Sequence, residues 1–337
     1  MSATRARWII PLLVLAAAAA LLHALAVGSV NVPLAELLRA LRGDASSQAA
    51  AVIFDLRLPR AICAFAAGAL LALAGAVLQA LLRNPLADPY VLGVSGGASV
   101  AALLAFTVWG AGAPVWAVQG AAAAGSLATL MLLFVLSRRA FFMRELSAAD
   151  DASVGVLLTG VMLAAFFGAI VSLLLALAGD GQLRGMVFWL LGDLAGATDL
   201  RLGGAAVGAL LVCALIAQRH AAAMNLLLRG DVLAFTQGVD VTRTRRMLVL
   251  VAALATGSAV SLAGAVGFIG FVAPHLMRVL LGNDQRVLLP AAVLAGGTLV
   301  TIADSVARTV IAPVQLPVGV VTALVGVPVF LWFIRHR

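Results

Sequence analysis

The sequence contains no lysine, and only 11% of its 337 residues are charged. An ordinary soluble domain carries roughly a quarter charged residues. Hydrophobic residues make up 64% of the chain, which is more apolar surface than a soluble core could bury. The scarcity of charge therefore excludes a soluble globular protein and predicts a membrane protein.

The chain also lacks the residue patterns of enzymes and metal sites. Cys63 and Cys213 lie far apart inside apolar runs, where each thiol is expected to act as a small buried hydrophobe. His23 and His275 have no second ligand at metal spacing. There is no P-loop and no HExxH signature, and residues 93–97 lack the strand-to-helix setting of a nucleophile elbow. We expect no catalytic residue, cofactor or metal site.

Apolar stretches recur along the chain at the length of about 20 residues that a membrane-spanning helix needs. The first stretch exceeds the apolar core of a signal peptide and has no small-residue cleavage site, so we count it as a span. The run 247–281 is too long for one crossing and is divided by glycines and Pro274. Ten spans are expected near residues 8–28, 61–82, 91–109, 115–136, 152–178, 200–217, 247–265, 266–281, 287–306 and 317–334.

The net charge of +8 comes from arginine alone. With ten spans and a cytoplasmic N-terminus, fifteen of the 22 arginines lie inside and seven outside, in accord with the positive-inside rule. An odd number of spans would place Arg335 and Arg337 outside. We therefore interpret the excess charge as a topology signal rather than a nucleic-acid site, and expect both termini in the cytoplasm.

The chain matches itself when it is shifted by 189 positions. The matched positions are Gly68 with Gly257, residues 73–77 with 262–266, Pro85 with Pro274 and residues 92–93 with 281–282. The matched spans, the second and seventh, are five crossings apart and so run in opposite directions. Inverted repeats of this kind are typical of transporters. We expect one domain, residues 1–337, with repeat halves at about 57–180 (spans 2–5) and 246–334 (spans 7–10).

Residues 83–90 form a turn that contains two prolines, and three glycines follow it within residues 91–98. Prolines and glycines this close together break a helix beside the membrane. Irregular backbone there must be covered by protein or line a wet cavity. A plain turn between helices explains the same residues, so both interpretations remain.

Four motifs, in chain order, resemble the FecCD-type permeases for iron-siderophores, haem and cobalamin over essentially the whole chain. They are Arg57-Leu58-Pro59-Arg60, Asn84-Pro85-Leu86-Ala87-Asp88-Pro89, Gly267-Phe268-Ile269-Gly270-Phe271-Val272-Ala273-Pro274-His275-Leu276-Met277-Arg278 and Leu316-Pro317-Val318-Gly319. The resemblance implies an all-α polytopic permease in the bacterial inner membrane. It also implies two permease copies as a homodimer, two cytoplasmic ATPase subunits and a periplasmic binding protein that delivers a metal chelate.

In that family the substrate passes between the two copies, along segments that match residues 151–179 and 317–334. We expect an iron chelate, siderophore or haem, ahead of cobalamin, because iron chelates are the family's commonest cargo. These segments consist mainly of alanine, glycine, valine and leucine, which do not identify the chelate. No nucleic acid is expected as a partner.

Three arginines match the family's outward residues that receive glutamates of the binding protein, namely Arg57, Arg60 and Arg308. A guanidinium offers a rigid fork of donors to a carboxylate. Arginines at helix ends also serve as lipid anchors, and this alternative stays open. Asp304 is the one carboxylate expected inside a span. An ion pair with Arg308, four residues later, accounts for it at least as well as a proton relay.

The family's cytoplasmic gate uses the asparagine and leucine of its Asn-Pro-Leu turn, which match Asn84 and Leu86. A small hydroxyl residue near the start of the fifth span completes that gate, and Ser153 is the nearest candidate. The surrounding Asp150-Asp151-Ala152 departs from the family pattern. A helix N-cap explains Ser153 equally well.

The longest cytoplasmic loop, residues 220–246, holds two short amphipathic pieces separated by Gly230. The corresponding region of the family docks into the ATPase. The resemblance therefore implies coupling roles for Leu227, Leu228, Arg229, Gly230, Asp231 and Phe235. A helix that lies on the lipid surface without a partner is the alternative.

Two other classes of protein compete with the importer permease. An ion-gradient-driven secondary transporter would share the inverted repeat but would need intramembrane carboxylates, of which Asp304 is the one candidate. An intramembrane enzyme would need paired catalytic groups, and none is visible in the sequence.

Overall fold

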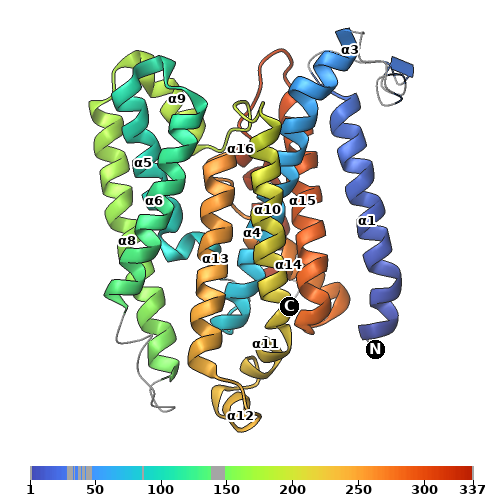
Figure 1. The fold of residues 1–337 in the computed structure, drawn as a ribbon, viewed down its shortest axis with the longest axis vertical. Coiled ribbons are helices and arrows are strands. Elements are labelled where there is room, and N and C mark those ends of the chain that lie inside the picture. The colour runs from blue at the N-terminus through green and yellow to red at the C-terminus, as the bar shows by residue number, and fades with distance from the viewer. Residues whose placement is uncertain are drawn as a thin grey trace.

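The computed structural model describes residues 2–28, 48–85, 87–137 and 149–335, together with Pro33, Ala35, Glu36, Arg39 and Arg42. The regular elements in this part of the chain are all helices, and most of them lie side by side as a bundle (Figure 1). The expected all-α membrane architecture is confirmed.

Ten helices occupy the ten expected spans. They are α1 (Ser2–Ala26), α4 (Leu58–Leu81) with the π-helix η1 (Val52–Arg57) before it, α5 (Val94–Trp109), α6 (Val115–Leu136), α8 (Ala149–Leu177), α10 (Leu200–Arg219), α13 (Val241–Ala263), α14 (Ile269–Leu281), α15 (Gln285–Thr309) and α16 (Val318–Arg335). Seven are long and apolar enough to cross a membrane, whereas α5, α14 and α16 have shorter apolar lengths. The short elements are α3 (Gln48–Ala51), η2 (Pro89–Leu92), η3 (Gly110–Gly112), α9 (Asp180–Leu190), α11 (Ala221–Leu227) and α12 (Asp231–Thr236).

Helix α4 is the centre of the bundle, where it packs against α10, α13, α14 and α15. Its residues from Ala66 to Leu81 are all buried. Small residues allow neighbouring helices to come close, as is common between helices in membranes. A Cβ atom on Gly75 would lie 1.7 Å from the carbonyl oxygen of Gly270, and one on Gly68 would lie 2.3 Å from that of Gly296. Glycine is therefore required where α4 crosses α14 and α15.

Several element boundaries differ from the expectation. Helix α13 begins at Val241 rather than near 247, because an apolar run marks the membrane part of a helix and not its polar first turns. The break between α13 and α14 falls at residues 264–268, with Gly264 at φ 65°, whereas Pro274 lies inside α14. Helix α9 was not predicted. Its Met186 and Trp189 complete a second apolar core with α5 and α6.

The expected inverted repeat stays a prediction, with which the helix directions are compatible. Figure 1 shows α4 and α13 running in opposite directions, and each is followed by three further bundle helices. The shift of 189 positions aligns only the first part of α4 with α13, because residues 75–79 inside α4 fall on the break at residues 264–268. Pro85 lies in the turn after α4, while its match Pro274 lies within α14, so the loops of the two halves differ in length.

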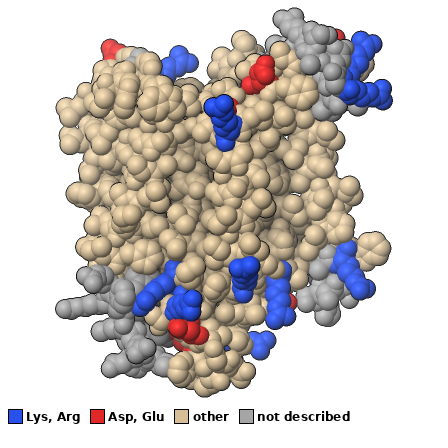
Figure 2. Space-filling model, viewed as in Figure 1, with Lys and Arg blue, Asp and Glu red and all other residues tan. Residues whose placement is uncertain are grey.

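The two ends of the bundle are polar and its middle is not. Figure 2 shows arginines gathered at the α12 end, fewer charges at the α3 end, and an uncharged band between them on this face. This distribution matches a membrane protein whose apolar band lies in lipid.

Replacing Gly75 with alanine tests the packing of α4. The added Cβ would overlap the Gly270 carbonyl, so we expect the variant to lose about 1–3 kcal/mol of stability. Gly208→Ala in α10 is the matched control, because a Cβ there meets no atom within 4 Å. Thermal unfolding of both variants in detergent measures the difference. Equal unfolding temperatures would show that α4 has room for the extra carbon.

Candidate functional site

The three arginines expected to face outward lie together at the α3 end of the bundle, around Asp304 of α15. We call Arg57, Arg60, Asp304 and Arg308 the arginine cluster. The Asp304 carboxylate is 1% exposed and accepts from Arg60 Nη2 at 2.8 Å and Nε at 3.0 Å. Its other oxygen pairs with Arg308 Nε at 3.0 Å. The expected Asp304–Arg308 pair is present, and Arg60, 244 positions away, is a further partner that the sequence analysis missed.

The end of α1 provides the remaining acceptors of this cluster. Arg57 Nη1 donates to the carbonyl oxygens of Leu25 and Ala26, each at 2.8 Å, and Arg308 Nη2 donates to that of Ala24 at 3.3 Å. The last carbonyls of a helix have no partner within the helix and carry partial negative charge. Arg57 and Arg308 are accordingly buried in the chain's own structure, at 5% and 6% exposure.

Arg60 is the member of the cluster with a contact at the surface. Its Nη1 donates to Gln315 Oε1 at 2.9 Å in an exposed position. Asp193, between α9 and α10, lies close enough to Arg60 for an electrostatic interaction. Burial raises the pKa of Asp193, and the Ala195 N–H and the Arg60 charge oppose that rise. A partner's carboxylate could reach Arg60 most directly.

The candidate gate lies in the turn between α4 and α5. Asn84 is exposed there, Leu86 lies outside the described residues, and Ser153 belongs to the first turns of α8 with its side chain outside the described part. The turn itself is well defined. Asp88 accepts a hydrogen bond from the Tyr90 N–H at 2.9 Å and so caps η2, and burial raises the Asp88 pKa.

The sequence analysis missed two polar residues that hold this turn, Gln79 and Arg278. Gln79, near the end of α4, is buried, and its amide lies 3.4 Å from the carbonyl oxygens of Gly270 and Phe271. Arg278 of α14 donates to Gln79 Oε1 at 2.8 Å. No sequence motif links these residues, because they are 199 positions apart.

The predicted coupling segment contains two short helices, α11 and α12, with Gly230 at φ 124° between them. Leu227 is buried and Leu228 partly buried against the chain's own core. Phe235 is 56% exposed, and Val232 and Leu233 are exposed beside it. Of the apolar residues expected in this segment, Phe235 on α12 is therefore exposed, whereas Leu227 and Leu228 pack against the chain's own core.

Asp231, the first residue of α12, is buried between two arginines. Its Oδ1 pairs with Arg83, the second residue after α4, and its Oδ2 lies 2.7 Å from Arg245 Nη2 on α13. Arg83 Nε also donates to the Leu227 carbonyl at 3.0 Å. We call Arg83, Asp231 and Arg245 the Asp231 triad. It joins the predicted coupling segment to residues 83–90, which we call the gate turn.

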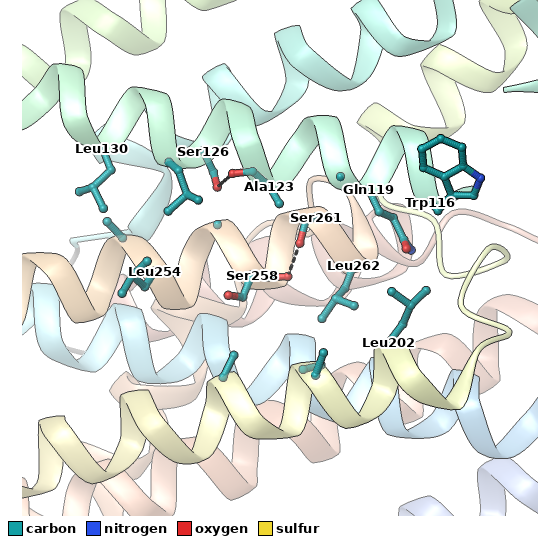
Figure 3. Close-up of a pocket in the computed structure, with 17 residues that line it drawn as sticks. Trp116, Gln119, Ala123, Ser126, Leu130, Leu202, Leu254, Ser258, Ser261 and Leu262 are labelled. Carbon is teal, nitrogen blue, oxygen red and sulfur yellow. Dashed lines mark hydrogen bonds between the residues drawn. The ribbon is translucent and has the colours of Figure 1, made fainter. Parts of the chain in front are cut away.

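A groove of about 420 Å³ lies among α6, α10 and α13 (Figure 3). Its walls are mainly apolar, with Gln119, Ser126, Ser258 and Ser261 as polar residues. Neither α8 nor α16 lines it. The groove is therefore separate from the substrate path that the resemblance places along residues 151–179 and 317–334.

Comparison with known proteins gives one family. Residues 13–336 match the FecCD transport family. The chain is 39% identical over 288 residues to the cobalamin import system permease protein BtuC of Halobacterium salinarum, covering 85% of this chain and 74% of that protein. It is 38% identical over 322 residues to the hemin transport system permease protein HmuU of Yersinia pestis, covering 94% and 93%.

A solved structure has the same fold. It is an ABC transporter of the metal-chelate type in an inward-facing conformation, 27% identical in sequence. The TM-score is 0.82, and the alignment covers 98% of this chain and all of that one. These similarities extend over the whole helical bundle. The chain belongs to the FecCD transport family, as a multi-pass membrane permease that transports rather than catalyses.

Proposed function

We propose that this permease imports a bulky metal chelate, with energy supplied by cytoplasmic ATPase subunits that bind the α11–α12 segment. The observation that carries the proposal is the family match over residues 13–336, and relatives at 38–39% identity are named for cobalamin and hemin transport. The proposed substrate is accordingly an iron chelate, such as a siderophore or haem, or cobalamin. The membrane is then the bacterial inner membrane, with both termini in the cytoplasm.

Two copies of the chain would form the translocation path. Helix α8 exposes large apolar residues along its length, among them Met162 and Phe166, and α16 exposes Leu324 and Val325. These are the two helices that match the family's path-lining segments. Residues 155–177 of α8 contain no charged side chain, so this wall offers no specific ligand to a metal chelate. Selectivity would then reside in a periplasmic binding protein.

The arginine cluster is the proposed docking point for that binding protein. Arg60 and Arg308 pair with one buried carboxylate, Asp304, and Arg57 lies within range of the Arg308 charge, so the cluster has more arginines than carboxylates. A partner's glutamates would approach Arg60 first, because its guanidinium also reaches the surface at Gln315. Arg57 and Arg308 would engage only if the binding protein drew them away from the end of α1.

The contacts of Asp304 also argue against the secondary transporter. A gradient-driven mechanism would need this carboxylate to exchange a proton or bind a cation. Both of its oxygens are instead occupied by Arg60 and Arg308.

ATP-dependent uptake tests the proposed function. We expect proteoliposomes that contain the permease, its ATPase and its binding protein to accumulate hemin or cobalamin only when ATP is enclosed. The chain alone should release no phosphate from ATP, because it has no P-loop. Uptake driven by an imposed ion gradient without ATP would support the secondary transporter instead.

Removing the Arg60 charge tests the docking site. We expect Arg60→Gln to weaken association with the binding protein roughly tenfold, about 1.4 kcal/mol, and wild-type affinity to fall with added salt. Arg201→Gln, at an exposed position at the start of α10, serves as the matched control. Surface plasmon resonance on permease complexes in nanodiscs measures both. Salt-insensitive binding that Arg60→Gln leaves unchanged would contradict docking at the arginine cluster.

Charging the exposed face of α12 tests the ATPase contact. We expect Val232→Asp with Phe235→Asp to abolish copurification of the ATPase, because a carboxylate cannot be buried in an apolar interface without a partner. The permease should still fold, since both side chains are exposed. Thr236→Asp, at the exposed end of α12, is the matched control, because it adds a carboxylate to the same helix without replacing an apolar residue. A double variant that still copurifies its ATPase at normal yield would refute this docking surface.

A further inference from the structure

Arg83 has a backbone conformation that its side chain makes unfavourable. It directly follows the last residues of α4 and has φ 49°, in the left-handed region. Glycine is the usual residue at this position after a helix, because a Cβ atom is strained there. Among the described residues only Arg83 and Phe268 have a positive φ without being glycine. A strained arginine at this point indicates that its guanidinium has a role that glycine could not fill.

The guanidinium of Arg83 binds the coupling segment at its bend. It donates to the carbonyl oxygen of Leu227, the last residue of α11, at 3.0 Å. It also pairs with Asp231, the first residue of α12. One side chain thus contacts both short helices on either side of Gly230. A movement of that bend displaces the atoms that Arg83 holds.

The coupling segment is also held to the bundle. Asp231 is 7% exposed, and its second oxygen lies 2.7 Å from Arg245 Nη2 on α13. On α11, Asn225 donates to Asp284 at 2.7 Å and accepts from the Gln285 N–H at 2.9 Å, at the start of α15. The segment therefore connects to the bundle through directional polar contacts, and the contact to Arg83 leads into the gate turn.

The C-terminal end of the gate turn contacts α8. Asp88 caps η2, and η2 packs against α8. At the end of η2, Gly93 is so close to α8 that a Cβ on it would lie 3.0 Å from the Gly160 carbonyl oxygen. Contacts thus lead from α12 to Arg83 and from η2 to α8, and the backbone of the turn joins these two ends. Coupling between distant sites requires such a physical chain of contacts.

We infer that Arg83 is the positioning residue that transmits movement of the α11–α12 segment to the gate turn and α8. The inference rests on the function proposed above, in which an ATPase moves that segment. ATP-driven displacement of α12 pulls Asp231, and the Arg83 guanidinium carries the displacement into residues 83–90. Docking of the ATPase itself uses the exposed face of α12 and does not involve Arg83.

Replacing Arg83 with glycine separates transmission from folding. Glycine removes the guanidinium from the buried Asp231 and at the same time relieves the backbone strain, which offsets part of that cost. Because Arg245 stays paired with Asp231, the variant should fold, with a somewhat lower thermal stability than the wild type. In the full complex with ATPase and binding protein, we expect normal ATPase copurification and unchanged basal ATP hydrolysis. Hemin or cobalamin taken up per ATP hydrolysed should fall roughly tenfold, within the about 5–150-fold span of typical coupling energies. Arg83→Lys keeps the positive charge but carries it on a single nitrogen. Its uptake per ATP hydrolysed should therefore lie between that of the wild type and that of Arg83→Gly.

The controls distinguish the possible results. Arg219→Ala, at the exposed end of α10, removes a positive charge from the same end of the bundle and should transport normally. Wild-type uptake per ATP in Arg83→Gly would overturn the inference, and so would loss of ATPase copurification, since Arg83 would then act in docking. If the glycine variant does not fold, the uptake per ATP hydrolysed by Arg83→Lys tests the inference instead, and a wild-type value would overturn it. A wild-type chain that binds no ATPase would refute the proposed function itself.

Discussion

The close packing of α4 against α13, α14 and α15 is the constraint on which both polar ends of the molecule depend. Gly68 and Gly75 bring its backbone against carbonyl groups of neighbouring helices, and burial extends along most of its length. A helix of 24 residues spans roughly 36 Å. Arg60 stands near its beginning and Arg83 just after its end. A single buried helix therefore fixes the arginine cluster relative to the Asp231 triad.

The two ends use the same electrostatic arrangement. Asp304 lies between Arg60 and Arg308, and Asp231 lies between Arg83 and Arg245. In each case one buried carboxylate joins arginines from different segments of the chain. Removing one partner of a buried ion pair leaves an uncompensated charge, which costs several kcal/mol. Such contacts hold different segments together at the two ends of a bundle whose core is mainly apolar.

The positions of these clusters give the proposed transport cycle a structural basis. The arginine cluster faces the end where a binding protein would dock, and α12 exposes its apolar face at the other end (Figure 1). Helix α8, the proposed wall of the path, contacts the gate turn through η2 and Gly93. In the proposed cycle, movement of α12 would reach α8 through the turn that follows α4.

The sequence by itself determined the helical class, the ten spans, the Gly230 bend and the Asp304–Arg308 pair, because hydropathy, turn residues and helical spacing are local properties. It did not reveal α9, whose apolar residues are few, or the first turns of α13, which are polar. Only the tertiary structure decided which residues meet across the bundle, such as Arg60 with Asp304 and Arg83 with Asp231. It also decided that Leu227 is buried in its own subunit while Phe235 is exposed. These outcomes follow from how closely α4 packs, and that depends on glycines whose contact partners lie some 200 positions away in the chain.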